Sequence, residues 1–190
     1  MKIEKINSFL VRDQFIVEII TDKGISGIGQ SACWAYPEAV KSIVDRFENI
    51  LIGKDPFMIE EINQLLMRTG PFRGSVLSGA ISCIDIALWD IKGKYSNMPI
   101  YDLLGGRFRD TVRLYCNSWF DDCDTPEDYA KAAKMNLLDK GYSACKLDPF
   151  LEMVPFHTMY QDGFISQAGE EEGYDIVSAV RDVVGPKFEI

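Results

Sequence analysis

The sequence predicts an α+β domain followed by the first strand and helix units of a parallel α/β domain. Apolar and polar residues alternate with a strand period up to residue 30, and apolar residues then recur at helical spacing as far as a glycine pair at 105–106. From residue 111 onward, strand-like and helix-like stretches alternate, which is typical of parallel sheets. The two domains are therefore expected at residues 1–110 and 111–190.

The first 30 residues predict a small antiparallel sheet. Phe15, Val17 and Ile19 fall on one face of a strand, because successive side chains point to opposite faces. Strands are expected over residues 2–11, 15–21 and 25–30, with a turn at 22–24. These three strands would form a meander.

Helices are expected after the sheet. Apolar residues at helical spacing, prolines in first turns and glycines at the ends indicate where they lie. The expected helices run from Pro37 to Gly53, from Pro56 to Gly70, from Leu77 to Tyr95 and, as a short last helix, within residues 98–106. The third carries one apolar stripe over about five turns, so it is expected to be a core helix.

The second domain has the pattern of two strand and helix units and the start of a third strand. The expected strands cover residues 111–118, 143–148 and 187–190, and the expected helices cover 125–141 and 169–184. Thr125 is suited to cap the first of these helices, with Pro126 in its first turn and Gly141 at its end. Residues 149–167 show no clear period.

The charge balance excludes several classes of partner. The chain has 20 Lys and Arg against 29 Asp and Glu, a formal net charge of −9, and no basic run long enough to follow phosphates. Nucleic acid and anionic membranes are therefore not expected as partners. The start of the chain lacks the apolar region of a signal peptide, and no apolar run approaches the ~18 residues of a membrane span. A cytoplasmic protein is expected.

Cysteine and histidine usage disfavours several kinds of site. The five cysteines are odd in number and include no Cys-x-x-Cys pair, which argues against a disulfide scaffold and a zinc ribbon. His157 is the single histidine, so no site built on two or three imidazoles is expected from this chain. No Gly-x-Ser-x-Gly elbow accompanies it to suggest a nucleophile triad.

A long signature lies on the third expected helix and its tail. Residues 79–94 have the sequence Gly-Ala-Ile-Ser-Cys-Ile-Asp-Ile-Ala-Leu-Trp-Asp-Ile-Lys-Gly-Lys, and residues 99–106 have the sequence Pro-Ile-Tyr-Asp-Leu-Leu-Gly-Gly. This signature resembles the mandelate racemase and muconate lactonizing branch of the enolase superfamily. The resemblance implies an α+β capping domain followed by a TIM-like (β/α)7β barrel. The chain would hold the first βα units of an incomplete barrel, truncated at its third strand.

Three polar or aromatic residues of the signature are interpreted as structural. Asp85, Trp89 and Asp90 lie on the core helix, where a carboxylate needs hydrogen-bond donors. Asp90 can reach Lys94, which follows it by four residues. These residues identify the family and are not expected to perform its chemistry.

The sequence Ala-Cys-Lys-Leu-Asp-Pro-Phe at residues 144–150 is the chemically informative motif. Alternation places Lys146 and Asp148 on one face of a strand, and barrels of this kind hold their active sites at the C-terminal strand ends. A Lys-x-Asp-Pro-Phe strand resembles sugar-acid dehydratases of gluconate and galactonate type, whereas racemases and cycloisomerases of the family carry Lys-x-Lys. Lys146 then matches a lysine beside the substrate carboxylate, where a cation offsets charge on an enediolate. The structural alternative is an ion pair of Lys146 with Asp148 or with a neighbouring strand.

By the same resemblance, two loops of the first domain are implied to select the substrate. They cover residues 28–36 and 69–73. Trp34 is a candidate wall of the pocket, and Arg73 is a candidate clamp for a carboxylate or hydroxyls. His157 is a candidate residue of a lid over the site. The alternatives are a solvated surface arginine and a structural loop histidine.

The resemblance also implies Mg²⁺, held by three acidic residues at the ends of the third, fourth and fifth barrel strands. These ligands are absent from this chain, so no metal ligand is assigned. Glu170, Glu171 and Glu172 are interpreted as charges that favour a helix start. The chain is interpreted as the N-terminal portion of an enzyme, expected to be inactive alone.

The leading hypothesis is a Mg²⁺-dependent sugar-acid dehydratase, a hydro-lyase. A base would take the proton at C2, an enediolate would form, and the 3-hydroxyl would leave as water. The alternatives are a racemase or cycloisomerase of the same superfamily and a non-catalytic truncated cap domain that only oligomerises. The expected partners are a small-molecule sugar acid and further copies of the chain.

Overall fold

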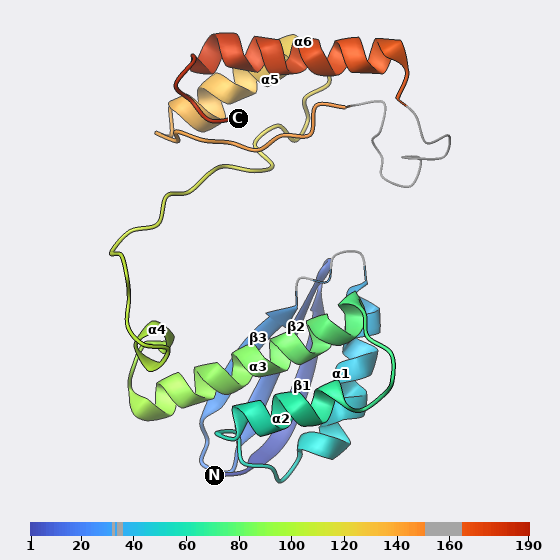
Figure 1. The fold of residues 1–190 in the computed structure, drawn as a ribbon, viewed down its shortest axis with the longest axis vertical. Coiled ribbons are helices and arrows are strands. Elements are labelled where there is room, and N and C mark those ends of the chain that lie inside the picture. Colours follow the sequence, from blue (N-terminus) through green and yellow to red (C-terminus); the bar gives the residue numbers. More distant parts are fainter. Residues whose placement is uncertain (32, 34–35, 151–164) are drawn as a thin grey trace. The chain divides into compact units, whose positions relative to one another are not determined.

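The computed structural model describes residues 1–31, 33, 36–150 and 165–190 (Figure 1). The chain forms two compact units, Met1–Phe108 and Arg109–Ile190. Each unit encloses its own cluster of buried hydrophobic residues. A separate hydrophobic core is a defining property of a domain.

The first unit begins with an antiparallel sheet in the order β1-β2-β3. Its strands are β1 (Ile3–Val11), β2 (Gln14–Thr21) and β3 (Ser26–Ser31). The predicted meander is confirmed, and alternation along β2 buries Phe15, Val17 and Ile19 on one face.

The helices of the first unit pack on that buried face or on one another. They are α1 (Pro37–Leu51), α2 (Ile59–Met67), α3 (Ser75–Ser96) and the short α4 (Ile100–Leu103). Helices α1 and α3 pack on each other and on the sheet, and α2 packs on α3 (Figure 1). The side chains that they bury include Val40, Val44, Phe47, Leu51, Ile62, Leu66, Ile84, Leu88 and Ile91. The predicted core helix is therefore confirmed.

Helix α2 begins later than the sequence predicts. The expected start was Pro56, whereas the helix begins at Ile59. The Asp55 side chain accepts a hydrogen bond of 3.1 Å from the Phe57 N–H, and the Asp55 carbonyl accepts another of 3.1 Å from the Met58 N–H. An aspartate that bonds the backbone two residues on favours a turn over a helix. This turn delays the start of α2.

Strand β3 lies directly against the backbone of α3. Gly27 and Gly29 face the helix, and a Cβ atom at either position would overlap the carbonyl oxygen of Ala87 or Cys83. Because these glycines have no side chains, the two backbones approach more closely than packed side chains allow. The alternating glycines of β3 are therefore a packing requirement.

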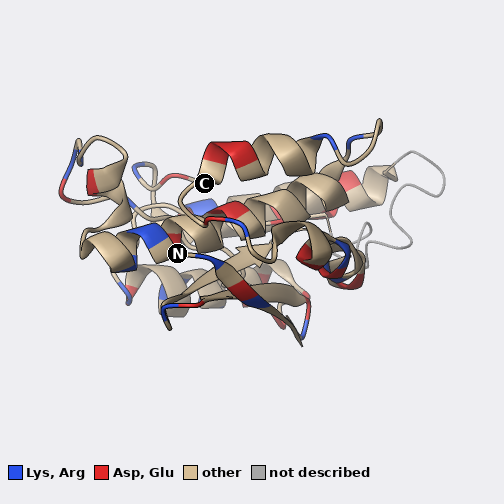
Figure 2. Ribbon diagram, turned by 90° about the horizontal axis from the view of Figure 1, so that it is seen from below, with Lys and Arg blue, Asp and Glu red and all other residues tan. Residues whose placement is uncertain are grey.

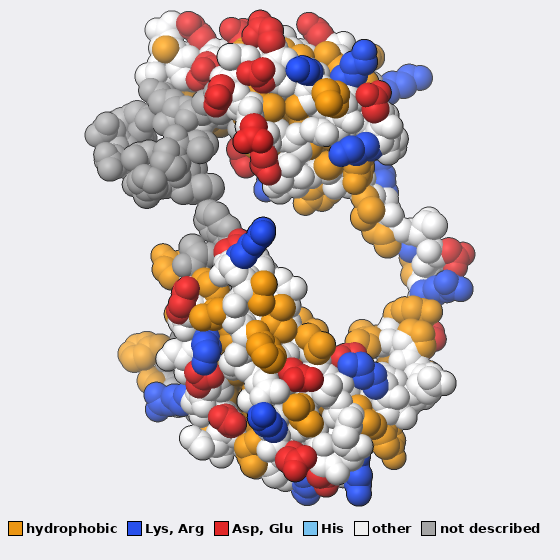
Figure 3. Space-filling model, turned by 180° about the vertical axis from the view of Figure 1, so that it is seen from behind, with side chains coloured by type: hydrophobic (Ala, Val, Ile, Leu, Met, Phe, Trp, Pro, Cys, Tyr) orange, Lys and Arg blue, Asp and Glu red, His pale blue; other side chains and the backbone are white. Residues whose placement is uncertain are grey.

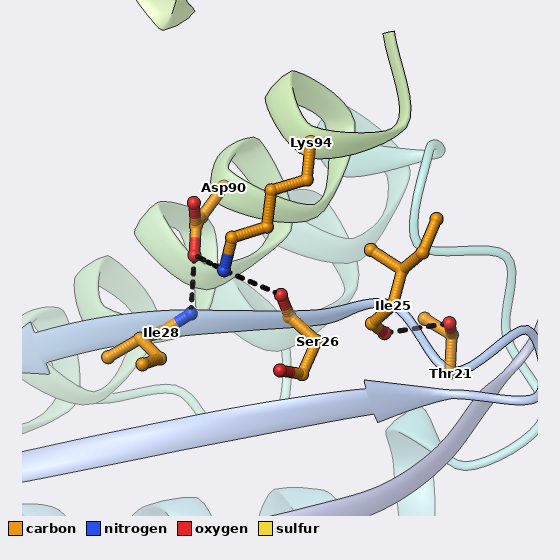
Figure 4. Close-up of polar contacts among 6 residues, drawn as sticks. All are labelled: Thr21, Ile25, Ser26, Ile28, Asp90 and Lys94. Atoms are coloured by element: carbon orange, nitrogen blue, oxygen red, sulfur yellow. Dashed lines mark hydrogen bonds and ion pairs between the residues drawn. The ribbon is translucent and has the colours of Figure 1, made fainter. Parts of the chain in front are cut away.

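A polar clasp joins the outer edge of β3 to α3 (Figure 4). Asp90 Oδ2 accepts hydrogen bonds from the Ile28 N–H at 2.9 Å and from Lys94 Nζ at 2.7 Å. Lys94 Nζ also donates to the Ser26 carbonyl at 2.8 Å. The expected contact between Asp90 and Lys94 is confirmed. The clasp also satisfies backbone groups on an edge strand that would otherwise be open to pairing with another chain.

The second unit holds three extended segments that pair in parallel. Cys116 pairs with Cys145, and Ala144 pairs with Glu189, so the segment around residue 145 lies between the other two. Parallel pairing agrees with the expected alternation of strands and helices. The pairing is less continuous than predicted, because among the described residues these two bridges are the only ones outside the named strands. Within the described chain, each outer segment has a neighbouring segment on one side only, so its backbone groups on the other side have no strand to pair with.

Helices cover one side of these segments. Helix α5 (Pro126–Ala133) continues into a π-helical turn, η1 (Lys134–Leu138), and α6 (Gln167–Val184) follows later in the chain. Thr125 caps α5 as predicted, because its hydroxyl accepts the Asp128 N–H and the Asp128 side chain accepts the Thr125 N–H. Helices and segments together bury Trp119, Tyr129, Ala133, Leu137, Cys145, Ile176, Val180 and Phe188.

Charged and hydrophobic side chains are mixed on the face that Figure 3 shows. Acidic and basic residues are interspersed along the ribbon in Figure 2. Figure 3 shows hydrophobic side chains scattered among polar and charged ones. Among the helices in the described part of the chain, none combines the length and the apolar character needed to cross a bilayer.

Candidate active site

The segment that carries Lys146 is held by its neighbours on both sides. The Lys146 N–H donates to the Cys116 carbonyl at 2.8 Å. On the other side, the Cys145 N–H donates to the Glu189 carbonyl at 2.9 Å. Consecutive residues of the middle segment therefore bond to opposite neighbours, as expected in a parallel sheet.

Alternation along this segment separates core side chains from exposed ones. Cys145 and Leu147 pack into the core of the second unit, whereas Lys146 and Asp148 are exposed. The two polar residues therefore lie on the side that faces away from the core. Within the described residues, Lys146 and Asp148 form no ion pair, and no acidic oxygen lies within 4.0 Å of the Lys146 ammonium.

A hollow of about 370 Å³ lies beside Lys146. Its lining residues are Arg113, Leu114, Tyr115, Ala144, Cys145, Lys146, Glu189 and Ile190. The Arg113 guanidinium pairs with Glu189 at 2.5 Å and donates to the Ser143 hydroxyl and carbonyl at 3.3 and 3.2 Å. Arg113 thus ties all three segments together, and its charge is balanced by Glu189. Lys146 supplies the positive charge of the hollow that no described acid balances.

Trp119 contacts the Lys146 backbone and was not among the residues predicted from sequence. Its indole N–H donates to the Lys146 carbonyl at 2.8 Å, although the two residues are 27 positions apart. Trp119 is 5% exposed and belongs to the core of the second unit. The available signal was a tryptophan directly after an expected strand, since a buried indole N–H usually finds an acceptor.

Arg73 lies in the first unit, on the loop between α2 and α3. Its Nη1 donates to the Gly70 carbonyl at 2.5 Å and to the Phe72 carbonyl at 3.2 Å. The guanidinium therefore holds its own loop, beside a hollow of about 460 Å³ that Arg46 and Phe47 also line. Arg73 remains exposed, so its other N–H groups are accessible.

Two predicted substrate contacts have no described position. Trp34 and His157 lie outside the described residues. The structure therefore brings Lys146 and Asp148 onto one segment and places Arg73 on a loop of the other unit.

The described residues do not form a magnesium site. No group of three or more His, Cys, Asp or Glu side chains that could hold a metal ion occurs in residues 1–31, 33, 36–150 and 165–190. Glu170 lies in the first turn of α6, and Glu171 accepts a hydrogen bond from Gln167 at 2.9 Å. These contacts fit charges at a helix start, where acidic side chains are favourable.

Beside the hollow lies the buried thiol of Cys145. Burial raises the pKa of Cys145, and the nearby Cys116 contributes in the same direction. A thiol with a raised pKa is a weak nucleophile, because the thiolate is the reactive form. Cys145 is therefore a packing residue, and Lys146 is an exposed cation among the residues that line the hollow.

Comparison with known proteins assigns the first unit. The family model for the mandelate racemase/muconate lactonizing enzyme N-terminal domain matches residues 8–105. Two relatives are a D-galactonate dehydratase from Pectobacterium atrosepticum and a D-gluconate dehydratase from Thermoproteus tenax. Their matches to the chain are 34% identical over 100% of it and 33% identical over 92% of it, respectively.

A solved structure extends the similarity across both units. A member of the enolase superfamily from Salmonella Typhimurium is similar over 100% of this chain, with a TM-score of 0.87 and 35% identity. The chain covers 54% of that structure, 47% of the Pectobacterium relative and 34% of the Thermoproteus relative. It therefore spans about half or less of the length of these proteins.

Proposed function

The chain belongs to the mandelate racemase/muconate lactonizing enzyme family of the enolase superfamily, and we propose that it supplies the N-terminal part of a sugar-acid dehydratase. One observation carries the proposal: Lys146 and Asp148 are exposed side by side in a Lys-x-Asp-Pro-Phe segment, away from the core. Relatives named as D-galactonate and D-gluconate dehydratases support the substrate class.

Lys146 is proposed to bind the carboxylate of the sugar acid. Its ammonium has no acidic partner among the described residues, so it is available to an anionic ligand in the adjacent hollow. When the C2 proton leaves, negative charge grows on the carboxylate oxygens, and a fixed cation beside them stabilises that charge. Lys146 therefore has a role that strengthens during the reaction.

The reaction that this arrangement serves removes one water molecule. The C2–H bond breaks with its proton passing to a base, the C3–O bond breaks, and the hydroxyl leaves with a proton as water. The product is a 2-keto-3-deoxy sugar acid. The base and the acid are proposed to be residues other than those described here. The same applies to the ligands of the Mg²⁺ that the family resemblance implies, because the described residues do not fit such a site.

The two units are proposed to have distinct roles. Residues 1–110 would form the capping domain, and residues 111–190 would form the start of the barrel, with the three parallel segments as its first strands. Arg73, Trp34 and His157 are proposed as substrate contacts from the surrounding loops. Further copies of the chain as partners, and a cytoplasmic location, are proposed as well.

The test uses the protein that contains these 190 residues, incubated with D-galactonate and D-gluconate in D2O with Mg²⁺. Dehydration predicts a 2-keto-3-deoxy acid, detected by NMR and mass spectrometry. A racemase would instead exchange the C2 proton for deuterium, with loss of configuration and without loss of water. Deuterium exchange without dehydration, or the absence of both reactions, would contradict the proposal.

A further inference from the structure

Both backbone polar groups of Lys146 bond to the first parallel segment and the loop that follows it. The N–H donates to the Cys116 carbonyl at 2.8 Å, and the carbonyl accepts the Trp119 indole N–H at 2.8 Å. The first bond belongs to the sheet, whereas the second comes from a side chain. Together they fix the backbone from which the Lys146 side chain extends.

Trp119 is itself held in place. Its ring stands edge-on to Phe120 and Tyr129, with centroids 5.5 and 6.1 Å away. Ser118, just before it, has a left-handed φ of 52°, a conformation that costs energy for a residue other than glycine. The Trp119 carbonyl accepts a hydrogen bond of 2.9 Å from Asn136 Nδ2. The indole therefore reaches Lys146 from a rigid support.

Asn136 lies at the centre of the π-helical turn Lys134–Leu138. The wider turn is closed by a hydrogen bond of 3.0 Å from the Asp139 N–H to the Lys134 carbonyl, five residues back. Lys140 Nζ donates to Asn136 Oδ1 at 3.3 Å, so the Asn136 amide is bonded at both ends. Single π-helical turns are rare in proteins, and those that occur often lie at functional sites. Here the turn coincides with the residue that holds Trp119.

We propose that Trp119 is a positioning residue for Lys146, acting through its indole N–H, with Asn136 fixing Trp119 in turn. The inference rests on the proposed function, in which Lys146 binds the substrate carboxylate. A misplacement of about 1 Å in a substrate-binding group can slow catalysis about 100-fold. A single bond to the Lys146 backbone therefore affects the rate more than its own strength suggests.

The first arm of the test uses the 190-residue chain and asks whether the bond from the Trp119 indole N–H holds the Lys146 backbone in place. Trp119→Phe keeps an aromatic ring and removes the N–H donor, while Trp89→Phe, on α3 of the first unit, is the matched control. The Lys146 amide keeps its bond to the Cys116 carbonyl in Trp119→Phe, but the loss of the bond to the Lys146 carbonyl frees the same backbone. Hydrogen exchange at the Lys146 amide should therefore speed up at least about 5-fold through more frequent local opening. Exchange at Ala133 in the same core should stay unchanged. Unchanged exchange at Lys146 would show that Trp119 does not hold the Lys146 backbone, and would overturn the proposal.

The second arm measures catalysis in the protein that contains this chain. Trp119→Phe should lower kcat about 10-fold with KM changed less than about 2-fold, because the cation is needed most in the transition state. Trp89→Phe should keep both values. A purely structural Trp119 would lower the melting temperature and leave kcat per folded molecule unchanged, which would overturn the proposal.

Asn136→Asp is a second variant that tests the proposal even if Trp119→Phe folds poorly. It is nearly isosteric, removes the donor to the Trp119 carbonyl, and should move both readouts in the same direction by a smaller factor. Normal kcat and normal Lys146 exchange in Asn136→Asp would contradict the role of Asn136. A wild-type protein without dehydratase activity would overturn the proposed function, and the exchange arm would still decide whether Trp119 anchors Lys146.

Discussion

Two charged sites, one in each unit, differ in whether the fold pairs their charges. In the first, Asp90 and Lys94 of the family signature bond to each other and to the edge of β3, so both charges have partners within the fold. In the second, Arg113 is paired with Glu189, but Lys146, two residues after Ala144, has no acidic partner among the described residues. A charge in a finished internal network is structural, whereas an exposed cation without such a network is available to a ligand.

The two units also differ in how continuous their sheets are. The first unit has a continuous three-stranded sheet with helices over its buried face. The second has three segments joined by two isolated bridges, with helices on one side and the hollow of Lys146 beside them. Substitutions in the packed core of the first unit should therefore act on stability, and substitution of Lys146 at the hollow should act on catalysis.

The largest effect is expected where β3 touches α3. Gly29→Ala would push a methyl group into the carbonyl of Cys83, and we expect a loss of about 3 kcal/mol in the free energy of unfolding of the first unit. Urea unfolding read by hydrogen exchange of α3 and α6 amides separates the two units. Gly70→Ala, which meets no atom within 4 Å, should change stability by less than about 0.5 kcal/mol. Equal losses from both variants would refute the close-packing explanation.

The next effect is catalytic. Lys146→Ala in the protein that contains this chain should lower kcat about 100-fold, because a charge that stabilises the transition state is removed. The melting temperature should move by less than about 2 °C, since Lys146 is exposed. Lys131→Ala on the surface of α5 is the control and should keep full activity. A nearly normal kcat with a lowered melting temperature would show that Lys146 is only structural.

A smaller effect is expected at the clasp on β3. Asp90→Ala removes the acceptor of the Ile28 N–H and the partner of Lys94, and should cost about 1 kcal/mol of unfolding free energy. Asp45→Ala is the control, because among the described residues Asp45 pairs only with Lys41, four residues away on α1, at 2.5 Å. That variant should cost less than about 0.5 kcal/mol. Indistinguishable denaturation curves would mean that the clasp contributes no more than a surface pair.

The smallest effect is a shift in titration at the start of α5. The hydrogen bond from the Thr125 side chain lowers the pKa of Asp128 below its usual 3.8. The stability that the Asp128 carboxylate contributes is therefore fully present above pH 3.8, the ordinary pKa. It is lost as the pH falls through the lowered pKa of Asp128 in the folded state. Thr125→Val should move the Asp128 pKa back toward 3.8, measured by NMR of its carboxyl carbon. The same pKa in both proteins would argue against the capping box.

Much of the fold follows from short-range patterns. Strand alternation predicted β2, helical spacing predicted α3, and the four-residue spacing predicted the pair of Asp90 and Lys94. The start of α2 could not be predicted in this way, because the side chain of Asp55 competes with the helix for backbone donors.

The surroundings of Lys146 were less accessible to prediction. The motif showed which two residues share a face of the strand, but not that the Lys146 carbonyl meets an indole from 27 residues earlier. Such a contact depends on how two distant segments pack, and the spacing of apolar residues along the sequence does not reveal that packing. The π-helical turn was equally hidden, because a five-residue stretch is too short to show a change in helical period.

The glycines of β3 also govern which strand alignments the first unit can adopt. A shift of β3 by one residue would turn Ile28 toward α3, into a space that is closed even to a methyl group. A misaligned strand could therefore not dock on the helix at all, instead of docking with a few poor contacts. The narrow gap between β3 and α3 therefore selects the strand alignment that places Gly27 and Gly29 against the helix over an alignment shifted by one residue.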